Sequence, residues 1–304
     1  MGTDWEQIFS KWIGRASDAE QERYEWTLRE VRQALGDHQP LSAYAYESYP
    51  KGSYPNFTNV VRDSDVDVAV EMRTSFNYVF RGQAEGMTRE EAGISLYTGN
   101  LTLASFKDEV STALTRRFGA NNVRRGSKAI HLRESARGLA ADVVPCQTHR
   151  LYRRRSPGGY EEGILLLDDD HPLRELVNFP RQHLQQGQVK NNETSRRYKR
   201  VVRILKRLEN LMVEEKIIAP VPSFLIESAI WNVPNRLLSS PPTWTQRVRG
   251  ALLHVYQGCN EEEAESSSEW LEANGIKYLF HPTQGWSRGD ITNYVDKAWD
   301  HLGF

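Results

Sequence analysis

Two aspartates separated by one residue stand where a β-strand is expected to begin. Asp65 and Asp67 alternate with Val66, Val68 and Val70, and successive side chains of a strand point to opposite faces, so one face is acidic and the other apolar. Two carboxylates this close repel each other unless a cation lies between them. Mg²⁺ prefers oxygen ligands and can orient a triphosphate, activate an attacking hydroxyl and neutralise a leaving pyrophosphate. The pattern therefore predicts a site for two Mg²⁺ ions.

Gly52 and Ser53 precede these acids and suit the other half of such a site. Glycine lets the backbone approach a phosphate closely, the serine hydroxyl can bond a phosphate oxygen, and N–H groups of a following turn cradle an anion. A third carboxylate is expected from a neighbouring strand, and Asp142 is the candidate because it interrupts the apolar run 139–145. The alternatives are a solvated edge strand for Asp65 and Asp67, and a strand-end acid facing water for Asp142.

The elements that must position these residues follow from hydrophobic periodicity. The first part is expected to hold helices at 18–35 and 103–118 and strands at 41–48, 64–72, 128–132, 140–146, 150–153 and 164–167. Helices then dominate, at 193–215, 223–231, 243–256, 265–273 and 288–301, with loops expected at 154–159 and 185–192. The fold class is therefore α+β: a mixed-sheet core over residues 1–168 and a helical lobe over residues 169–304.

Composition narrows the class of protein without naming a function. A chain of 304 residues can bury the cores of two lobes. A mean hydropathy of −0.63 argues against a membrane body, and residues 1–15 lack the pattern of a secretory signal, so we expect a cytoplasmic protein with no membrane partner. Lys and Arg total 39 against 40 Asp and Glu; any basic site must be local, and no stable binding to DNA is expected.

Three cations of the expected helix at 193–215 share one face. Lys199, Arg203 and Lys206 are spaced i, i+4 and i+7, and such a stripe suits a triphosphate. The alternative is a solvated basic face, because the same helix carries four further arginines, namely Arg196, Arg197, Arg200 and Arg207.

The stretch 51–68, which contains Gly52-Ser53 and the paired acids, resembles the signature of the CD-NTases. These are bacterial relatives of cyclic GMP-AMP synthase within the polymerase-beta-like superfamily, and the resemblance is greatest to clade E. It continues through 123–126, 141–144, 177–180, 198–206 and 222–234. The resemblance implies a nucleotidyltransferase core joined to a helical lobe, with triphosphates bound in the cleft between them. It also implies two Mg²⁺ ions, replaceable by Mn²⁺, on Asp65, Asp67 and Asp142.

The resemblance also assigns roles to residues of the second part of the chain. Lys206 resembles the lysine that holds donor phosphates, and Ser223 resembles a phosphate contact, with a helix N-cap as its alternative. Phe224 matches an aromatic ring that stacks on a nucleobase, with core packing as its alternative. Asn178 matches an asparagine that favours a pyrimidine, since an amide can pair with the imide edge of uracil; its alternative is a helix cap.

A cyclic dinucleotide containing UMP, made from NTPs with release of pyrophosphate, is the product that the resemblance implies. UTP and ATP would be substrates, and the product would signal phage infection to an effector protein, as in CBASS antiviral defence. A template-free transferase that extends RNA or a small acceptor is the alternative enzyme. A catalytically silent nucleic-acid sensor is the alternative of another class, and the intact acids Asp65, Asp67 and Asp142 argue against it.

Overall fold

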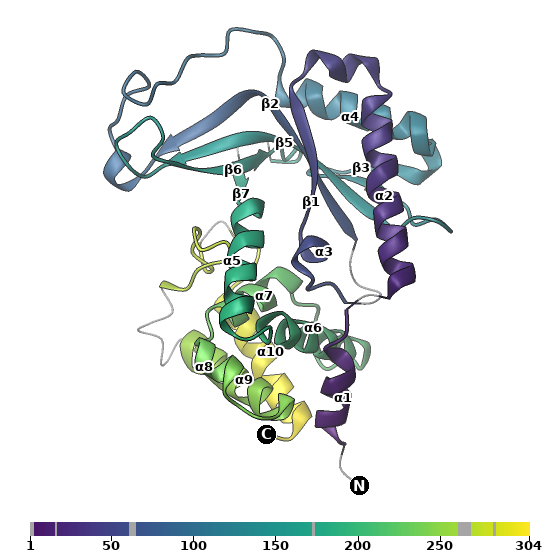
Figure 1. Ribbon diagram of the computed structural model, residues 1–304, viewed down its shortest axis with the longest axis vertical. Helices are drawn as coiled ribbons and strands as arrows, with labels where there is room; N and C mark the ends of the chain where they lie inside the picture. The colour runs from purple at the N-terminus through teal and green to yellow at the C-terminus, as the bar shows by residue number, and fades with distance from the viewer. Residues whose placement is uncertain (1–2, 16, 61–64, 172–173, 261–268, 282–283) are drawn as a thin grey trace. The chain divides into compact units, whose positions relative to one another are not determined.

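Residues 3–15, 17–60, 65–171, 174–260, 269–281 and 284–304 are described by the computed structural model (Figure 1). The chain forms two compact units, which we call the sheet unit (Ser17–Tyr54 and Asp65–Pro180) and the helical unit (Met1–Ala16, Pro55–Ser64 and Arg181–Phe304). The two units differ from the continuous ranges 1–168 and 169–304 that the sequence analysis gives for the core and the helical lobe. The N-terminal helix buries Phe9 in the core of the helical unit, and so belongs with residues far along the chain.

The sheet unit is built on a mixed sheet, as the sequence predicts. Its main order is β1-β2-β5-β4-β3, and β6 and β7 continue from β5. The β2–β5 pair is parallel, whereas the other pairs are antiparallel. The strands are β1 (Tyr46–Lys51), β2 (Val66–Phe80), β3 (Val123–Arg125), β4 (Ile130–Leu132), β5 (Ala141–Tyr152), β6 (Tyr160–Leu166) and β7 (Leu176–Asn178).

Helices α2 (Asp18–Gly36) and α4 (Leu103–Phe118) lie side by side and cover the sheet (Figure 1). The valine face of β2 packs against them, with Val66, Val68 and Val70 in one buried cluster with residues of both helices. This confirms the predicted apolar face and leaves the acidic face for other contacts. Short turns complete the unit: the 3₁₀ helices η1 (Gln39–Ala43), η2 (Gly82–Ala84) and η3 (Ala120–Asn122), and α3 (Ser53–Asn56), which leads into the helical unit.

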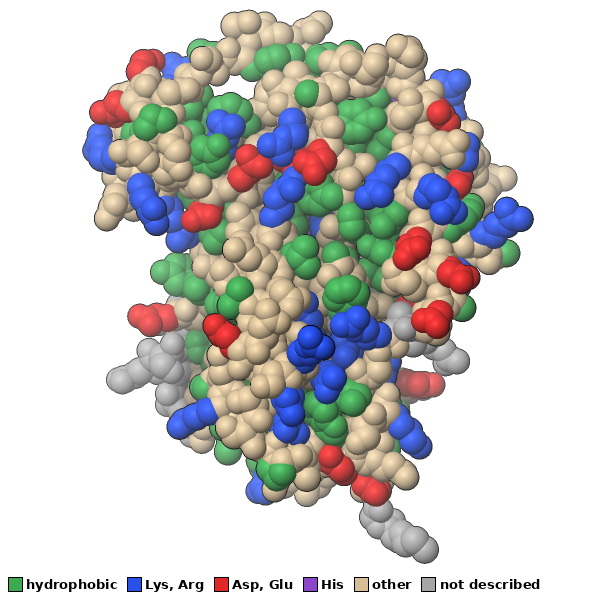
Figure 2. All heavy atoms as spheres, in the orientation of Figure 1, with side chains coloured by type: hydrophobic (Ala, Val, Ile, Leu, Met, Phe, Trp, Pro, Cys, Tyr) green, Lys and Arg blue, Asp and Glu red, His purple; other side chains and the backbone are tan. Residues whose placement is uncertain are grey.

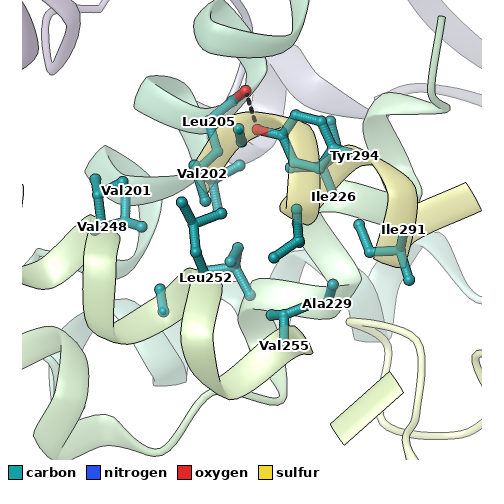
Figure 3. Packing of buried hydrophobic residues seen from close by; sticks show 14 of the residues in the cluster. Val201, Val202, Leu205, Ile226, Ala229, Val248, Leu252, Val255, Ile291 and Tyr294 are labelled. Atoms are coloured by element: carbon teal, nitrogen blue, oxygen red, sulfur yellow. Dashed lines mark hydrogen bonds between the residues drawn. The ribbon is translucent and has the colours of Figure 1, made fainter. Parts of the chain in front are cut away.

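The helical unit packs its helices around α6 (Tyr198–Glu214). Figure 3 shows apolar residues of α6, α7 (Ser223–Trp231), α9 (Trp244–Cys259) and α10 (Arg288–Leu302) meeting in one core. Within it, the hydroxyl of Tyr294 donates a hydrogen bond of 2.8 Å to the backbone carbonyl of Leu205 (Figure 3). The remaining helices are α1 (Trp5–Trp12), α5 (Pro180–Glu193) and α8 (Asn235–Ser239). None of the described helices is long and apolar enough to cross a membrane.

Several local predictions were wrong. The strands expected separately at 140–146 and 150–153 form one continuous strand, β5. Residues 39–43 form a 3₁₀ helix with Pro40 in its first turn, so the strand expected at 41–48 begins only at Tyr46. The expected loop 185–192 is part of α5. Its polar residues belong to a helix in which Gly187 lies close to the side chain of Asn56. The described part of the expected helix 265–273 contains a β-bridge at Leu271 instead, and residues 265–268 lie outside the described residues.

The buried hydroxyl of Tyr294 provides a test of the helical core. Tyr294→Phe removes its hydrogen bond and leaves the carbonyl of Leu205 with one partner fewer, so we expect the free energy of unfolding to fall by about 0.5–1.5 kcal/mol. Urea denaturation followed by tryptophan fluorescence measures this change. Tyr278→Phe is the matched control, because Tyr278 is 55% exposed and should cost almost nothing. Equal effects of the two substitutions would contradict the packing shown in Figure 3.

Candidate active site

Asp67 and Asp142 are neighbours across the β2–β5 pair. The parallel register places Asp67 opposite Asp142, near the start of each strand. Their side chains are 33% and 31% exposed, so they are open to a ligand and still held by the sheet. Asp65 lies just before β2 and is exposed. The expected contribution of a neighbouring strand is thus confirmed, whereas the role of the three acids stays a prediction.

Basic side chains from the two flanking strands contact this pair of acids. On one side, the Lys51 ammonium of β1 donates to Asp67 Oδ1 at 3.0 Å. On the other, His131 Nδ1 of β4 donates to Asp142 Oδ1 at 2.5 Å. Sequence reasoning missed both residues. The position of Lys51 directly before Gly52 was a usable signal, but only the pairing of β4 with β5 reveals His131.

Gly52 is required here by the carboxylate beside it. Its φ of 75° lies in the left-handed region, and a Cβ at this position would stand 2.2 Å from Oδ2 of Asp67. Any other residue would therefore displace the acid as well as strain the backbone. Ser53 follows as the first residue of α3 and is partly buried. Its predicted contact with phosphate stays a prediction.

The donor chemistry of this site fits a divalent cation in part. Carboxylates on adjacent strands in register are oxygen ligands of the kind that Mg²⁺ prefers. Among the described residues, however, no three His, Cys, Asp or Glu side chains converge closely enough to hold a metal ion. Lys51 and His131 occupy one oxygen each of Asp67 and Asp142, so binding of a cation would require the acids to exchange these partners.

Asn178 ends the edge strand β7, with its side chain exposed. It pairs with Ile164 of β6, and α5 begins at Pro180, so Phe179 rather than Asn178 stands directly before the helix. Next to Ile164, Gly163 allows a close approach: a Cβ there would lie 2.7 Å from the Asn178 carbonyl oxygen and 2.8 Å from the ring of Phe179. Gly163 is thus a positioning residue that sequence reasoning missed.

A buried histidine supports the same strand end. The rings of His149 and Phe179 meet edge to face, with centroids 6.4 Å apart. Burial lowers the pKa of His149 to about 4, so its ring is neutral near pH 7 and accommodates an apolar neighbour without a buried charge. Asn77 contacts its Nδ1 at 2.7 Å. His149 therefore packs against Phe179, the residue that directly follows Asn178.

In the helical unit, Lys206 forms a buried ion pair. Its ammonium lies 3.1 Å from Oε2 of Glu227 on α7, and the two residues are 3% and 2% exposed. Glu227 also accepts hydrogen bonds from His183 Nε2 at 2.8 Å and from the Thr58 hydroxyl at 2.7 Å. Burial alone would raise the pKa of Glu227, but Lys206 and His183 outweigh it and hold the pKa below its usual range.

Lys199 and Arg203 line a different feature, a cavity of about 360 Å³. Both are 4% exposed, so the alternative of a solvated basic face is wrong for these residues. Ser223 lines a second cavity, of about 810 Å³. Phe224 is partly buried and meets the rings of His183 and Trp286 edge to face. The structure thus brings Lys199 and Arg203 together, and places Lys206 and Ser223 elsewhere in the unit.

Comparison with known proteins agrees with this architecture. The cGAS/DncV-like nucleotidyltransferase C-terminal helical domain matches residues 185–303. The chain is 33% identical to the cyclic dipyrimidine nucleotide synthase CdnE of Cecembia lonarensis over 98% of both chains, and 32% identical to that of Legionella pneumophila over 99% of both. It is also similar to the solved structure of Rhodothermus marinus CdnE c-UMP-AMP synthase with Apcpp and Upnpp. Identity there is 28% and the TM-score 0.81, over 98% of this chain and 96% of that one.

These similarities span both units of the chain. The protein is therefore a nucleotidyltransferase with a polymerase-beta-like fold. It belongs to the cGAS/DncV-like, or CD-NTase, family, in which it is similar to the CdnE enzymes.

The close approach at Gly163 generates a stability prediction. Gly163→Ala forces the Asn178 carbonyl and the Phe179 ring apart, and we expect it to lower the free energy of unfolding by about 1–3 kcal/mol. Gly36→Ala is the control in the same unit, because Gly36 lies in α2 with no atom within 4 Å of an added Cβ; it should be neutral or stabilising. Urea denaturation compares them, and a neutral Gly163→Ala would refute the positioning role.

Proposed function

We propose that this protein synthesises a cyclic dinucleotide containing at least one UMP from NTPs, with release of pyrophosphate. The observation that carries the proposal is the in-register pair Asp67 and Asp142 beside Gly52 and Ser53. The full-length similarity to two cyclic dipyrimidine nucleotide synthases supports a pyrimidine product. Linkage of the first two nucleotides would leave a linear intermediate, which must rebind reversed so that a second transfer closes the ring.

Asp67 and Asp142, with Asp65 nearby, are the residues that would hold Mg²⁺ or Mn²⁺. Bound ions would lower the pKa of the attacking ribose hydroxyl and neutralise the charge of the leaving pyrophosphate. Lys51 and His131 reduce the repulsion between the acids by pairing with them. Gly52 leaves the space in which Asp67 stands, and Ser53 directly follows it to contact a phosphate.

The other predicted contacts complete the proposal. Lys199, Arg203, Lys206 and Ser223 would contact phosphates, and Phe224 would stack on a base. The Lys206 ammonium is already paired with Glu227. Glu227 would therefore orient this ammonium when it contacts a phosphate. We further propose that the product is a signal in cytoplasmic defence against phage and is read by an effector protein.

The role of the acids can be tested by removing two of their charges. Asp65→Asn with Asp67→Asn should lower product formation at least about a hundredfold, because carboxylates bind divalent cations far better than amides do. Labelled NTPs with Mg²⁺, followed by phosphatase treatment, reveal cyclic product as the resistant species. Glu85→Gln with Glu90→Gln removes two exposed charges of the same unit and should leave activity unchanged. Full turnover in a folded double Asn variant would exclude the metal assignment, and a phosphatase-sensitive product would exclude cyclisation.

The exposed amide of Asn178 provides the test of base choice. If it reads the uracil edge, the wild type should prefer UTP, and Asn178→Ser should shift preference toward purines by about ten- to a hundredfold, or about 1–3 kcal/mol. Competition among equal concentrations of four NTPs, scored by product mass, measures the shift. Asn100→Ser, at another exposed asparagine, is the control. Purine-only products from the wild type, or a variant that loses activity with unchanged preference, would refute this role.

A further inference from the structure

Five cationic side chains line one cavity of the helical unit. The cavity of about 360 Å³ lies where α6 begins, next to the segment that follows α1. Figure 2 shows Lys and Arg side chains gathered on this unit. The cavity is lined by Ile13, Gly14, Arg15, Phe57, Asn191, Arg196, Lys199, Arg200 and Arg203, and this lining contains no acid. It is therefore a concave surface with strong positive charge.

These cations have no ion-pair partners within the described part of the protein. None of the five forms an ion pair there. Arg203 donates to the neutral backbone carbonyls of Ile13 and Phe57, and the Lys199 ammonium contacts the side-chain oxygen of Gln188 at 3.4 Å. Glu227 influences Lys199 electrostatically, but its carboxylate is engaged by other residues. The five cations are thus held close together without an ion pair of their own.

The pKa values of the two buried members reflect the energetic cost of this arrangement. Burial, followed by repulsion from Arg15, Arg207 and Arg200, lowers the pKa of Arg203 to about 10. Burial also lowers the pKa of Lys199; Glu227 acts in the opposite direction, and the nearby charges of Arg15 and Arg203 lower the pKa further. An anion in the cavity would relieve the repulsion and raise both pKa values again.

The cavity is also preorganised. Lys199 and Arg203 are 4% exposed, so their side chains are fixed by packing before any ligand arrives. Ser195 and Arg196 have φ values of 49° and 64°, and Phe57 has a φ of 54°; these are left-handed conformations that are costly for residues other than glycine. Backbone strain is thus present both at 195–196 and at Phe57, beside the same basic cavity. Strain of this kind is typical of a binding site.

We propose that this cavity binds a compact anion carrying two or more linked phosphate groups. Its volume suits a small molecule, and guanidinium groups pair with phosphate oxygens through two hydrogen bonds at once. Two sources share this chemistry: a free oligophosphate, and the polyphosphate tail of a nucleotide. Lys199 and Arg203, to which the proposed function also assigns phosphate contacts, line the cavity, whereas Lys206 and Ser223 do not. For a nucleotide tail the proposal rests on the proposed function, but the binding of a free oligophosphate is measured without turnover and can fail or succeed by itself.

Isothermal titration of the full chain with inorganic tripolyphosphate tests the site. EDTA is present, so that no divalent cation recruits the probe to the acids of the sheet unit. Arg196→Gln with Arg200→Gln should raise the Kd about tenfold or more, and added salt should weaken wild-type binding. The matched control, Arg249→Gln with Lys297→Gln, removes two charges of the same unit outside the cavity and should bind as the wild type does. Thermal melting verifies that each variant is folded. If the Arg196→Gln, Arg200→Gln variant does not fold, Arg15→Gln, at an exposed residue, is used in its place.

A second titration, with UTP, separates the two sources. If the cavity takes a nucleotide tail, UTP competes with tripolyphosphate and loses affinity in the cavity variant. If it takes a free oligophosphate, tripolyphosphate still binds to UTP-saturated protein, and the affinity for UTP is unchanged in the variant. Both results support the site. Failure of tripolyphosphate to bind the wild type, or equal affinity for the wild type and folded cavity variants, would overturn the proposal.

Discussion

The parallel pairing of β2 with β5 is the constraint on which the sheet unit and its candidate site depend. It joins segments far apart in the sequence and places Asp67 opposite Asp142. β5 also carries β4, with His131, and β6, on which β7 and Asn178 rest. A slip of one residue would turn every side chain of a strand to the opposite face. The valine face of β2, buried under α2 and α4, prevents such a slip, so hydrophobic packing on one face fixes the acids on the other.

A buried charge network has a comparable place in the helical unit. Glu227 binds Lys206 of α6, His183 of α5 and Thr58 of the segment after α3. Removal of one partner from such a network typically costs about 3–5 kcal/mol, because a buried charge is left without compensation. The network therefore ties two neighbouring helices and a distant segment to α7. It also explains why a lysine at a predicted phosphate-binding position is held inside the unit.

The three cations that share one face of α6 have different partners in the folded protein, although they belong to one sequence pattern. Helical spacing places Lys199, Arg203 and Lys206 on one face, but their partners differ. Lys206 pairs with a carboxylate and Arg203 binds two backbone carbonyls. The Lys199 ammonium contacts an amide oxygen at 3.4 Å and lies 5.7 Å from the centroid of the Phe57 ring. Lys206 is therefore held in an ion pair at one end of the stripe, whereas Lys199 and Arg203 form none with the described residues.

The sequence by itself determined the class of fold, the helices 103–118 and 223–231, the valine face and the acid pair. These depend on local periodicity and on spacing along one strand. Only the tertiary structure decided that Lys51 and His131 flank the acids, that Gly52 and Gly163 are required by close neighbours, and that α1 belongs with distant helices. The polar segment 185–192 was mistaken for a loop, since its helix is stabilised by contacts with the rest of the unit and not by its own weak pattern. Strand register, burial and counter-charge depend on residues far apart in the chain, and local periodicity carries no information about them.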